Sequence, residues 1–489
     1  MKKSTLFVLS SLCAASLFAG TPMEVVGGDG AESGRTSIPS GDYDVILKPN
    51  ADTPSKAFFK TNSEGGLVTI NSLTTEGNPD LWDIAYSLTI DVKNSSSDVI
   101  ENVLVNNGKM QWRIGGVTFK NSLGNSATAK INLGEEFRLV HNNGTNESTW
   151  MSFNMNANVG GTYLNATMHA RTGLKAGNGA VVDYRVANST FSYSGSGIFL
   201  GGNSTFNNTG AMEFNSGTVL DIETGSVFNT TTAPTFKEGS TVNVRGEYNY
   251  TAAAGQSLTL RDASITGTLI TKGGVGSNLT LAGKTTVSGN GIINANGAII
   301  IDSGSLTVSD NGKISIVDDE TYEPRIRMGG GTLTLNVENA VQVNSTRFNL
   351  ANIVVYGGNG SKLIVNEDNK FRSLYFQSNH NITLDVAEDA TVFFEQISIG
   401  TGGGGTLLIE NFGDERIFFA SSDHWETISI SATDKNGKTF TKDDLELVAG
   451  TYIDGTNGFW LNAVVPEPST YAMIFGAIAL GFAAYRRRK

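Results

Sequence analysis

Few residues in this chain have the types and spacing that enzyme chemistry requires. The triplet Gly283-Lys284-Thr285 is of the kind that ends a phosphate-binding loop. Such a loop needs a glycine five residues before Gly283, where Asn278 stands, and a helix directly after the triplet. The sequence predicts neither, so we expect no nucleotide site. The histidines are too far apart in the sequence to show a zinc-site spacing; they are His141, His169, His380 and His424.

Hard oxygen donors gather at two places in the sequence. Asp318-Asp319-Glu320 with Glu323 forms one cluster, and Asp443-Asp444 with Glu446 forms the other. Carboxylates bind calcium when several of them converge on one ion, and acidic pairs in loops otherwise stay solvated. We expect no cofactor, no metal site and no catalytic residue, and calcium stays open as the alternative at these two clusters.

The end of the chain combines three physical features. A proline-rich motif keeps the backbone extended, because proline neither continues a helix nor donates to a sheet. Residues 471–485 are almost wholly apolar, and as a helix they would span about 22 Å, short of the ~30 Å hydrocarbon core of a bilayer. Four cations then favour a cytoplasmic end, which suits a transmembrane helix that anchors the chain temporarily. The motif consists of Pro466, Glu467, Pro468, Ser469 and Thr470, and the cationic stop of Arg486, Arg487, Arg488 and Lys489.

This constellation resembles the PEP-CTERM sorting signal, read here as Val-Pro-Glu-Pro-Ser-Thr. The resemblance covers only the end of the chain, but motif, apolar run, basic end and position agree together. It implies recognition by exosortase, a membrane-embedded cysteine transpeptidase-like protease, with Pro466, Glu467 and Pro468 as the recognition element. It also implies release or transfer to the cell surface, often alongside exopolysaccharide. An ordinary C-terminal tail anchor is the alternative.

The N-terminal 20 residues form a signal peptide of standard build. Lys2 and Lys3 precede an apolar stretch, which ends at the small residues Ala19 and Gly20. We therefore expect delivery by the Sec export machinery. Cys13 is the only cysteine and lies inside this stretch, so the exported chain has no disulfide and no thiolate chemistry.

The charge balance excludes one class of partner. The chain has 35 basic and 47 acidic residues, a formal net charge of −12. The two terminal segments carry six of the basic residues and one of the acidic ones, so the remaining chain is more acidic still. Such a surface repels phosphate backbones, and we expect no nucleic-acid partner. Acidity is compatible with neutral glycans, with divalent cations or with solubility alone.

The exported body is predicted to be all-β. Short runs of alternating apolar and polar residues recur, such as residues 88–92, and Gly, Asn, Ser and Asp bound them. Asn-Gly pairs appear repeatedly, and both residue types accept the positive φ of tight turns. No convincing run with helical periodicity occurs apart from the two ends.

A degenerate repeat runs through the middle of the chain. A glycine is followed by polar residues and an alternating strand, with intervals of 16 to 22 residues between glycines. A period near 20 suits one coil of a right-handed parallel β-helix, in which each coil buries its apolar face against its neighbours. The pattern is similar to autotransporter-like passenger domains, and a stack of antiparallel sheets is the alternative. The repeat glycines are Gly217, Gly239, Gly255, Gly276 and Gly297.

These features predict five regions. Residues 1–20 are the signal peptide, 21–190 a β-rich N-terminal region with tryptophan, 191–430 the solenoid, 431–463 a C-terminal β cap, and 464–489 the sorting signal with its transmembrane segment. We expect an exported structural or adhesive protein of the cell envelope, cell surface or extracellular matrix, anchored transiently in the inner membrane and associated with exopolysaccharide. The alternative is a β-helical polysaccharide lyase or hydrolase, because that fold hosts such enzymes, although fold alone does not assign one.

Overall fold

A computed structural model describes residues 20–464 with short gaps, together with 476–480 and 486. About 57% of the chain is strand and 3% is helix, and the strands form a right-handed parallel β-solenoid of about 15 turns. The all-β prediction and the parallel solenoid are therefore confirmed, in preference to stacked antiparallel sheets. The gaps are 29–33, 53–55, 62–67, 78, 92–98, 114–115, 124–127, 141–151, 157, 161–166, 171–172, 178, 193, 275, 319–322, 358–359 and 402.

The chain divides into two compact units. The N-terminal unit comprises residues 1–277 and 291–293, and the C-terminal unit comprises 278–290 and 294–489. The strand β33 (Ile292–Asn296) contributes residues to both. The division lies inside the region predicted as one solenoid, 191–430.

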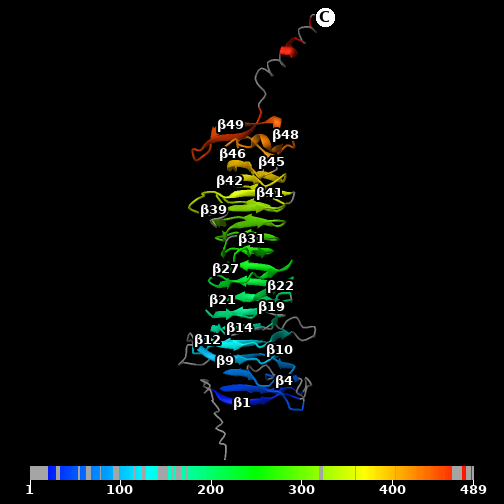
Figure 1. Cartoon of the computed structure of the whole chain (residues 1–489), viewed down its shortest axis with the longest axis vertical. Coiled ribbons are helices and arrows are strands. Elements are labelled where there is room, and N and C mark those ends of the chain that lie inside the picture. The colour runs from blue at the N-terminus through cyan, green and yellow to red at the C-terminus, as the bar shows by residue number, and fades with distance from the viewer. Residues whose placement is uncertain are drawn as a thin grey trace, which may run out of the picture. The chain divides into compact units, whose positions relative to one another are not determined.

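Three parallel ladders build the N-terminal unit, and Figure 1 shows its strands, from β1 in blue to β27 in green, lying one above another. Ladder A contains β1 (Thr21–Val26), β3 (Tyr43–Lys48), β6 (Ser72–Thr75), β9 (Val99–Val105), β12 (Thr128–Asn132), β15 (Asn158–Gly160), β18 (Val181–Tyr184), β21 (Thr205–Asn208), β24 (Val227–Thr230), β27 (Glu247–Ala252) and β30 (Thr268–Gly273). Ladder B contains β2 (Thr36–Ser37), β4 (Lys56–Lys60), β7 (Leu81–Ala85), β10 (Lys109–Arg113), β13 (Glu136–Val140), β16 (Thr167–Ala170), β19 (Asn188–Phe191), β22 (Ala211–Phe214) and β25 (Thr235–Phe236). Ladder C contains β5 (Val68–Ile70), β8 (Leu88–Asp91), β11 (Val117–Lys120), β14 (Ser152–Asn156), β17 (Gly173–Ala176), β20 (Gly197–Leu200), β23 (Val219–Ile222), β26 (Thr241–Val244) and β29 (Asp262–Ile265); the unit also holds β28 (Leu258–Leu260).

The C-terminal unit has two long ladders and one short one. Ladder D contains β31 (Asn278–Leu281), β34 (Ala298–Ile301), β37 (Arg325–Met328), β40 (Asn352–Val355), β42 (Asn369–Phe376), β44 (Val392–Ile399), β46 (Ile417–Phe419), β50 (Asn457–Ala463) and β49 (Leu445–Thr451). Ladder E contains β32 (Lys284–Val287), β35 (Ser305–Val308), β38 (Thr332–Leu335), β41 (Ser361–Val365), β43 (Asn381–Val386), β45 (Thr406–Phe412), β47 (Ser429–Asp434) and β48 (Thr439–Thr441). Ladder F pairs β36 (Lys313–Val317) with β39 (Val341–Asn344), and two short 3₁₀ helices, η2 (Trp425–Thr427) and η3 (Lys442–Asp444), complete the unit.

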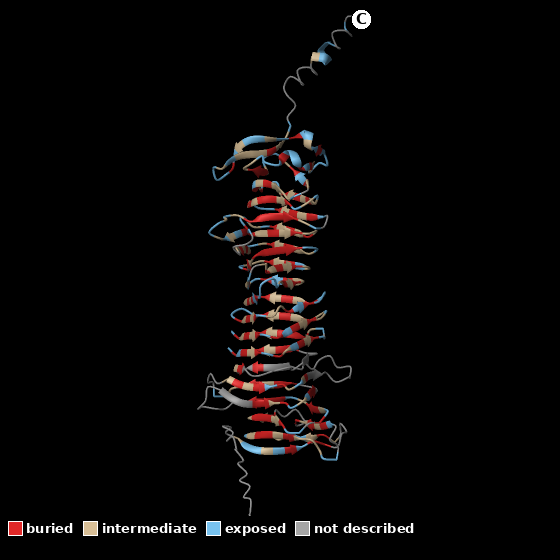
Figure 2. Ribbon diagram, in the orientation of Figure 1, coloured by how far each residue is buried: buried red, intermediate tan, exposed pale blue. Residues whose placement is uncertain are grey.

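Alternation within each strand separates the core from the surface. In β23, Leu220 and Ile222 are fully buried, while Val219 and Asp221, which alternate with them, are partly exposed. Successive side chains of a strand point to opposite faces, so this pattern directs one row inward on every turn. Figure 2 shows the resulting alternation of buried and partly exposed residues along the strands of each unit.

The repeat glycines lie where the backbone turns between strands. Gly217 has a φ of 77° and Gly239 a φ of 79°, a left-handed conformation that glycine adopts without the steric cost of a side chain. The glycine punctuation seen in the sequence therefore marks corners of the coil.

Parallel ladders begin well before residue 190. Trp82 on β7 and Trp112 on β10 are fully buried in ladder B of the N-terminal unit. Strands on both sides of residue 190 also pair in one ladder, as β18 does with β21. The tryptophan-bearing region predicted at 21–190 thus contains coils of the same kind, because an inward position in a coil accepts an aromatic side chain as well as an aliphatic one.

Antiparallel strands close the described part of the C-terminal unit. The strands β47 and β48 form a hairpin at the turn Asp434-Lys435-Asn436-Gly437-Lys438, where Asp434 N donates to Lys438 O at 2.9 Å. The strand β50 pairs antiparallel with both β46 and β49. An antiparallel layer changes the hydrogen-bond pattern at a solenoid end, which protects it from adding further parallel strands.

Acid should weaken the contact between the β49–β50 turn and the strand β42. Lys370 Nζ donates to Asp454 at 2.7 Å, and this bond, with those from Thr456, lowers the pKa of Asp454 from 3.8 to about 2. A lowered pKa means that the contribution to stability is present above about pH 4 and is lost as the pH falls toward 2. Both partners are partly exposed, so we expect no more than about 1 kcal/mol.

Thermal unfolding at pH 5 and pH 2.5 checks this expectation. Asp454→Asn should reduce the difference in Tm between the two pH values. An unchanged difference would mean that Asp454 does not contribute to acid sensitivity.

Candidate binding surfaces

A row of unlike side chains crosses three neighbouring strands of ladder C. Lys175 on β17 lies in register with Phe199 on β20, and Phe199 lies in register with Asp221 on β23. All three are partly exposed, because the residues beside them in each strand point into the core. The register therefore places a cation, an aromatic ring and a carboxylate side by side on the outside of the N-terminal unit.

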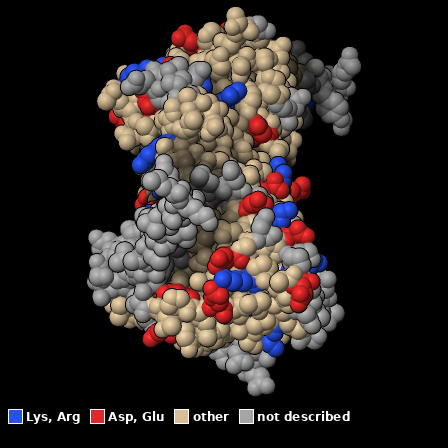
Figure 3. Space-filling view, turned by 60° about the horizontal axis from the view of Figure 1, so that its bottom comes forward, with Lys and Arg blue, Asp and Glu red and all other residues tan. Residues whose placement is uncertain are grey.

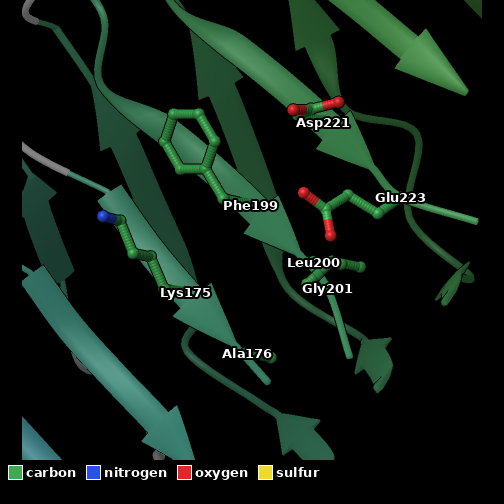
Figure 4. A pocket seen from close by; sticks show the side chains of 7 residues that line it. All are labelled: Lys175, Ala176, Phe199, Leu200, Gly201, Asp221 and Glu223. Atoms are coloured by element: carbon green, nitrogen blue, oxygen red, sulfur yellow. The ribbon is translucent and has the colours of Figure 1, made fainter. Parts of the chain in front are cut away.

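These side chains border a hollow of about 510 Å³. Figure 4 shows the Phe199 ring between the Lys175 ammonium group on one side and the two carboxylates on the other. We call this feature the Phe199 hollow; it is lined by Lys175, Ala176, Phe199, Leu200, Gly201, Asp221 and Glu223.

Two glycines allow the close packing of the hollow. A Cβ atom on Gly173 would lie 2.7 Å from Cε2 of the Phe199 ring, and one on Gly201 would lie 2.6 Å from Oε2 of Glu223. Real Cβ atoms do not approach other atoms so closely, so the ring and the carboxylate occupy space that only glycine leaves open. The ring therefore lies directly against β17, and Glu223 lies over the end of β20.

The charges around the hollow balance. Arg245 Nη2 lies 2.9 Å from Asp221 Oδ1 and 3.9 Å from Glu223 Oε1. Lys175 Nζ lies 6.0 Å from the centroid of the Phe199 ring, within reach of a cation–π interaction. Lys175 and the two carboxylates thus border the hollow, and Arg245 contacts the carboxylates, so these four groups supply donors and acceptors whose formal charges sum to zero.

A second cluster, the arginine corner, lies in the C-terminal unit. Its centre is Phe348, with the guanidinium carbon of Arg347 5.2 Å and that of Arg372 4.7 Å from the ring centroid. Arg347 pairs with Asp318, beside a cleft of about 520 Å³. The arginine corner consists of Asp318, Glu323, Arg347, Phe348, Arg372 and Glu395.

Two carboxylates of the arginine corner have pKa values that move in opposite directions. Arg372 Nη1 lies 2.5 Å from Glu323, and its hydrogen bond lowers the pKa of Glu323. Partial burial raises the pKa of Glu395, although Arg372 Nε lies 3.9 Å from it and opposes the rise. Pairs of this kind are what general acid–base catalysis uses.

The predicted sorting residues fall at the limit of what the structure describes. Pro466, Glu467, Pro468, Ser469 and Thr470 lie outside the described residues, as do Arg487, Arg488 and Lys489, while Arg486 and residues 476–480 are helical. In the part of the chain that the structure describes, no helix has the length and apolar character needed to cross a bilayer.

Each of the two acidic clusters noted in the sequence has a carboxylate that is bonded within the protein. Asp318 accepts hydrogen bonds from Arg347 and from Ser345, and Asp444 accepts two from Thr441 in the capping box of η3. Asp319 and Glu320 lie outside the described residues. Among those that are described, no three His, Cys, Asp or Glu side chains are placed to share a metal ion.

Sequence reasoning missed both surfaces. The strand that carries Asp221 follows the repeat glycine Gly217, but its register with the strands that carry Lys175 and Phe199 is not visible in the sequence. An alignment of the coils would have placed the three residues in one column. Comparison of the chain with family models, with curated proteins and with solved structures gives no match.

Proposed function

We propose that this protein is an exported structural or adhesive component of the cell surface or extracellular matrix, sorted through its C-terminal signal and associated with exopolysaccharide. The observation that carries the proposal is where the folded body ends. The strand β50 ends at Ala463, three residues before the sorting motif. A protease that cuts within the motif would therefore leave every described strand intact.

The hydrogen bonds at this end support a body that holds together without the tail. Ala463 N donates to Asp414 Oδ1 at 2.8 Å, and Val464 N donates to Asp444 O at 2.9 Å. The carboxylate of Asp414 and the carbonyl of Asp444 both belong to the body. The last described backbone groups before the motif are thus satisfied within the C-terminal unit.

The outer faces suit contact with a polyhydroxylated polymer. On ladder A, three side-chain amides form a ladder from turn to turn that ends on a carboxylate: Asn249 donates to Asn229 at 2.9 Å, Asn229 to Asn207 at 2.8 Å and Asn207 to Asp183 at 2.8 Å. On the face shown in Figure 3, acidic and basic side chains are interspersed among uncharged ones. On that face the side chains offer both hydrogen-bond donors and acceptors, which suits a neutral polymer better than a polyanion.

Mass spectrometry of the C-terminal peptide tests the proposal. We expect extracellular material to end within Pro466 to Thr470 and to co-fractionate with exopolysaccharide. Glu467→Ala should hold the chain in the membrane with Lys489 intact, and Glu446→Ala is the matched control because it changes a glutamate of the body instead. An intact Lys489 confined to membranes in the unaltered protein would overturn the proposal in favour of a tail-anchored envelope protein.

The arginine corner favours a second candidate, a polysaccharide hydrolase or lyase. Its specific support is the pair Glu323 and Glu395, which flank Arg372 with pKa values moved apart. An enzyme of this kind would release new ends from exopolysaccharide of the producing cell, and Glu395→Gln would reduce that release at least about 100-fold. We expect no release from the unaltered protein; release that survives in Glu395→Gln would exclude this pair as its cause.

A further inference from the structure

We infer that the Phe199 hollow binds a neutral hexose ring within a polysaccharide chain. This inference rests on the proposed association with exopolysaccharide and names a place and a sugar class for it. It is carried by the combination of an aromatic ring, two carboxylates and two cations on adjacent turns of ladder C.

The ring supplies the apolar part of the site. A pyranose has a face of C–H groups, and such a face packs against an aromatic side chain without needing a hydrogen bond. Phe199 is partly exposed on β20, and its position against Gly173 fixes the ring beside the hollow. The phenyl ring of Phe199 has no hydroxyl and no indole nitrogen, so it contributes contact area alone.

The rim supplies the polar part. Each sugar hydroxyl donates one hydrogen bond and accepts others, so a sugar site needs donors and acceptors close together. Asp221 and Glu223 accept, while Lys175 and Arg245 donate. Arg245 contacts both carboxylates and so holds them in place before a ligand arrives, which lowers the entropy cost of binding.

The charge balance selects the class of sugar. A uronate brought into the hollow would meet Asp221 and Glu223, and an amino sugar would meet Lys175 and Arg245. Because the rim holds both signs of charge, it offers no net attraction to offset the cost of desolvating either charged sugar. A neutral hexose avoids both conflicts.

The form of the hollow fits one unit of a longer chain. Its volume of about 510 Å³ lies within the range of small-molecule sites. Asn243 on β26 occupies the next register position after Asp221 and is partly exposed. The row therefore continues beyond the hollow with an amide that can bond to a neighbouring sugar.

Calorimetric titration of the full-length chain in mild detergent tests the inference. The probes are maltotriose and cellotriose as neutral sugars, with trigalacturonate and the glucosamine trimer as charged ones. We expect at least one neutral trimer to bind about tenfold more tightly than either charged trimer. Phe199→Leu should weaken that binding about tenfold, because an aromatic contact is lost while the volume is nearly kept.

Two further variants make the assignment specific. Tyr375→Leu removes a partly exposed aromatic ring from β42 of the C-terminal unit and should leave binding unchanged. Glu223→Gln keeps the shape but leaves the rim with an excess positive charge, so it should improve binding of trigalacturonate several-fold while weakening that of the neutral trimer.

Each failure has its own meaning. If no neutral trimer binds, or if Phe199→Leu binds as the unaltered chain does, the hollow is not a neutral-hexose site. If a charged trimer binds more tightly than both neutral ones, the sugar class is wrong. In all these cases extracellular, trimmed protein that co-fractionates with exopolysaccharide would leave the proposed function standing. A chain found only intact in membranes would overturn that function, whatever the titration shows.

Discussion

Phe206→Ala is expected to lower the free energy of unfolding of the N-terminal unit by about 3–5 kcal/mol. The Phe206 ring is fully buried, with its centroid 5.2 Å from that of Tyr184 and 5.8 Å from that of Phe228. Phe228 in turn meets Tyr248 edge-on at 5.2 Å. Truncation removes the second ring from a four-turn stack, so it loses the transfer free energy of one ring and leaves a cavity between its neighbours.

Guanidinium unfolding followed by tryptophan fluorescence measures this loss, because Trp82 and Trp112 are buried in the same unit. Thr205→Ala, which changes the partly exposed residue beside Phe206 in β21, is the control and should cost no more than about 0.5 kcal/mol. A Phe206→Ala midpoint equal to that of the control would show that the ring stack does not support the unit.

Asp83→Ala is expected to cost a similar amount, about 3–5 kcal/mol, for an electrostatic reason. Asp83 accepts a hydrogen bond from Arg35 Nη1 at 2.9 Å, and the two side chains are only 1% and 3% exposed. Arg35 Nη1 also donates to the carbonyl oxygens of Phe59 and Asp83 at 3.1 Å. Removal of the carboxylate breaks this buried ion pair and leaves the buried guanidinium group with less opposing charge than in the unaltered chain.

The double variant Arg35→Met with Asp83→Leu separates charge from packing. Replacing a buried ion pair with apolar side chains of similar size is often neutral, so this variant should recover most of the stability that Asp83→Ala loses. The same fluorescence measurement applies. If the double variant is as unstable as Asp83→Ala, the loss comes from packing and not from the broken ion pair.

The sequence predicted the fold better than the surfaces, and the repeat explains why. Gly217 and Gly239 mark corners because their positive φ is a local property of the backbone. The inward and outward rows follow equally from alternation within each strand. Which outward residues become neighbours depends instead on register between turns, and loops of unequal length between strands hide that register. Nothing in the linear sequence therefore predicted that Phe199 and Glu223 would be neighbours, although Asp221 stands in the repeat strand 217–222.

The early coils were harder to recognise for a related reason. The strands that carry Trp82 and Trp112 belong to the same ladder but lack the regular glycine interval of residues 217–297. Bulky inward residues suggested a separate region, whereas a coil only requires that the inward position be apolar. The proposed processing of the tail depends on recognition by another protein, which no fold determines.

The spacing of the contacts has a consequence for biogenesis. The amide ladder joins residues 20 to 24 positions apart, whereas Lys370 and Asp454 are 84 apart and Thr391 and Tyr452 are 61 apart. Under the proposed export, a chain that emerges from a translocon with its N-terminus first can therefore wind coil upon coil from contacts between neighbouring turns. Among the described hydrogen bonds, those of the closing strands reach back furthest, and these strands emerge last. Under the proposed sorting, a tail still held in the bilayer would keep the newest, uncovered edge beside the membrane until β50 is in place, and would release only a molecule that has already finished folding.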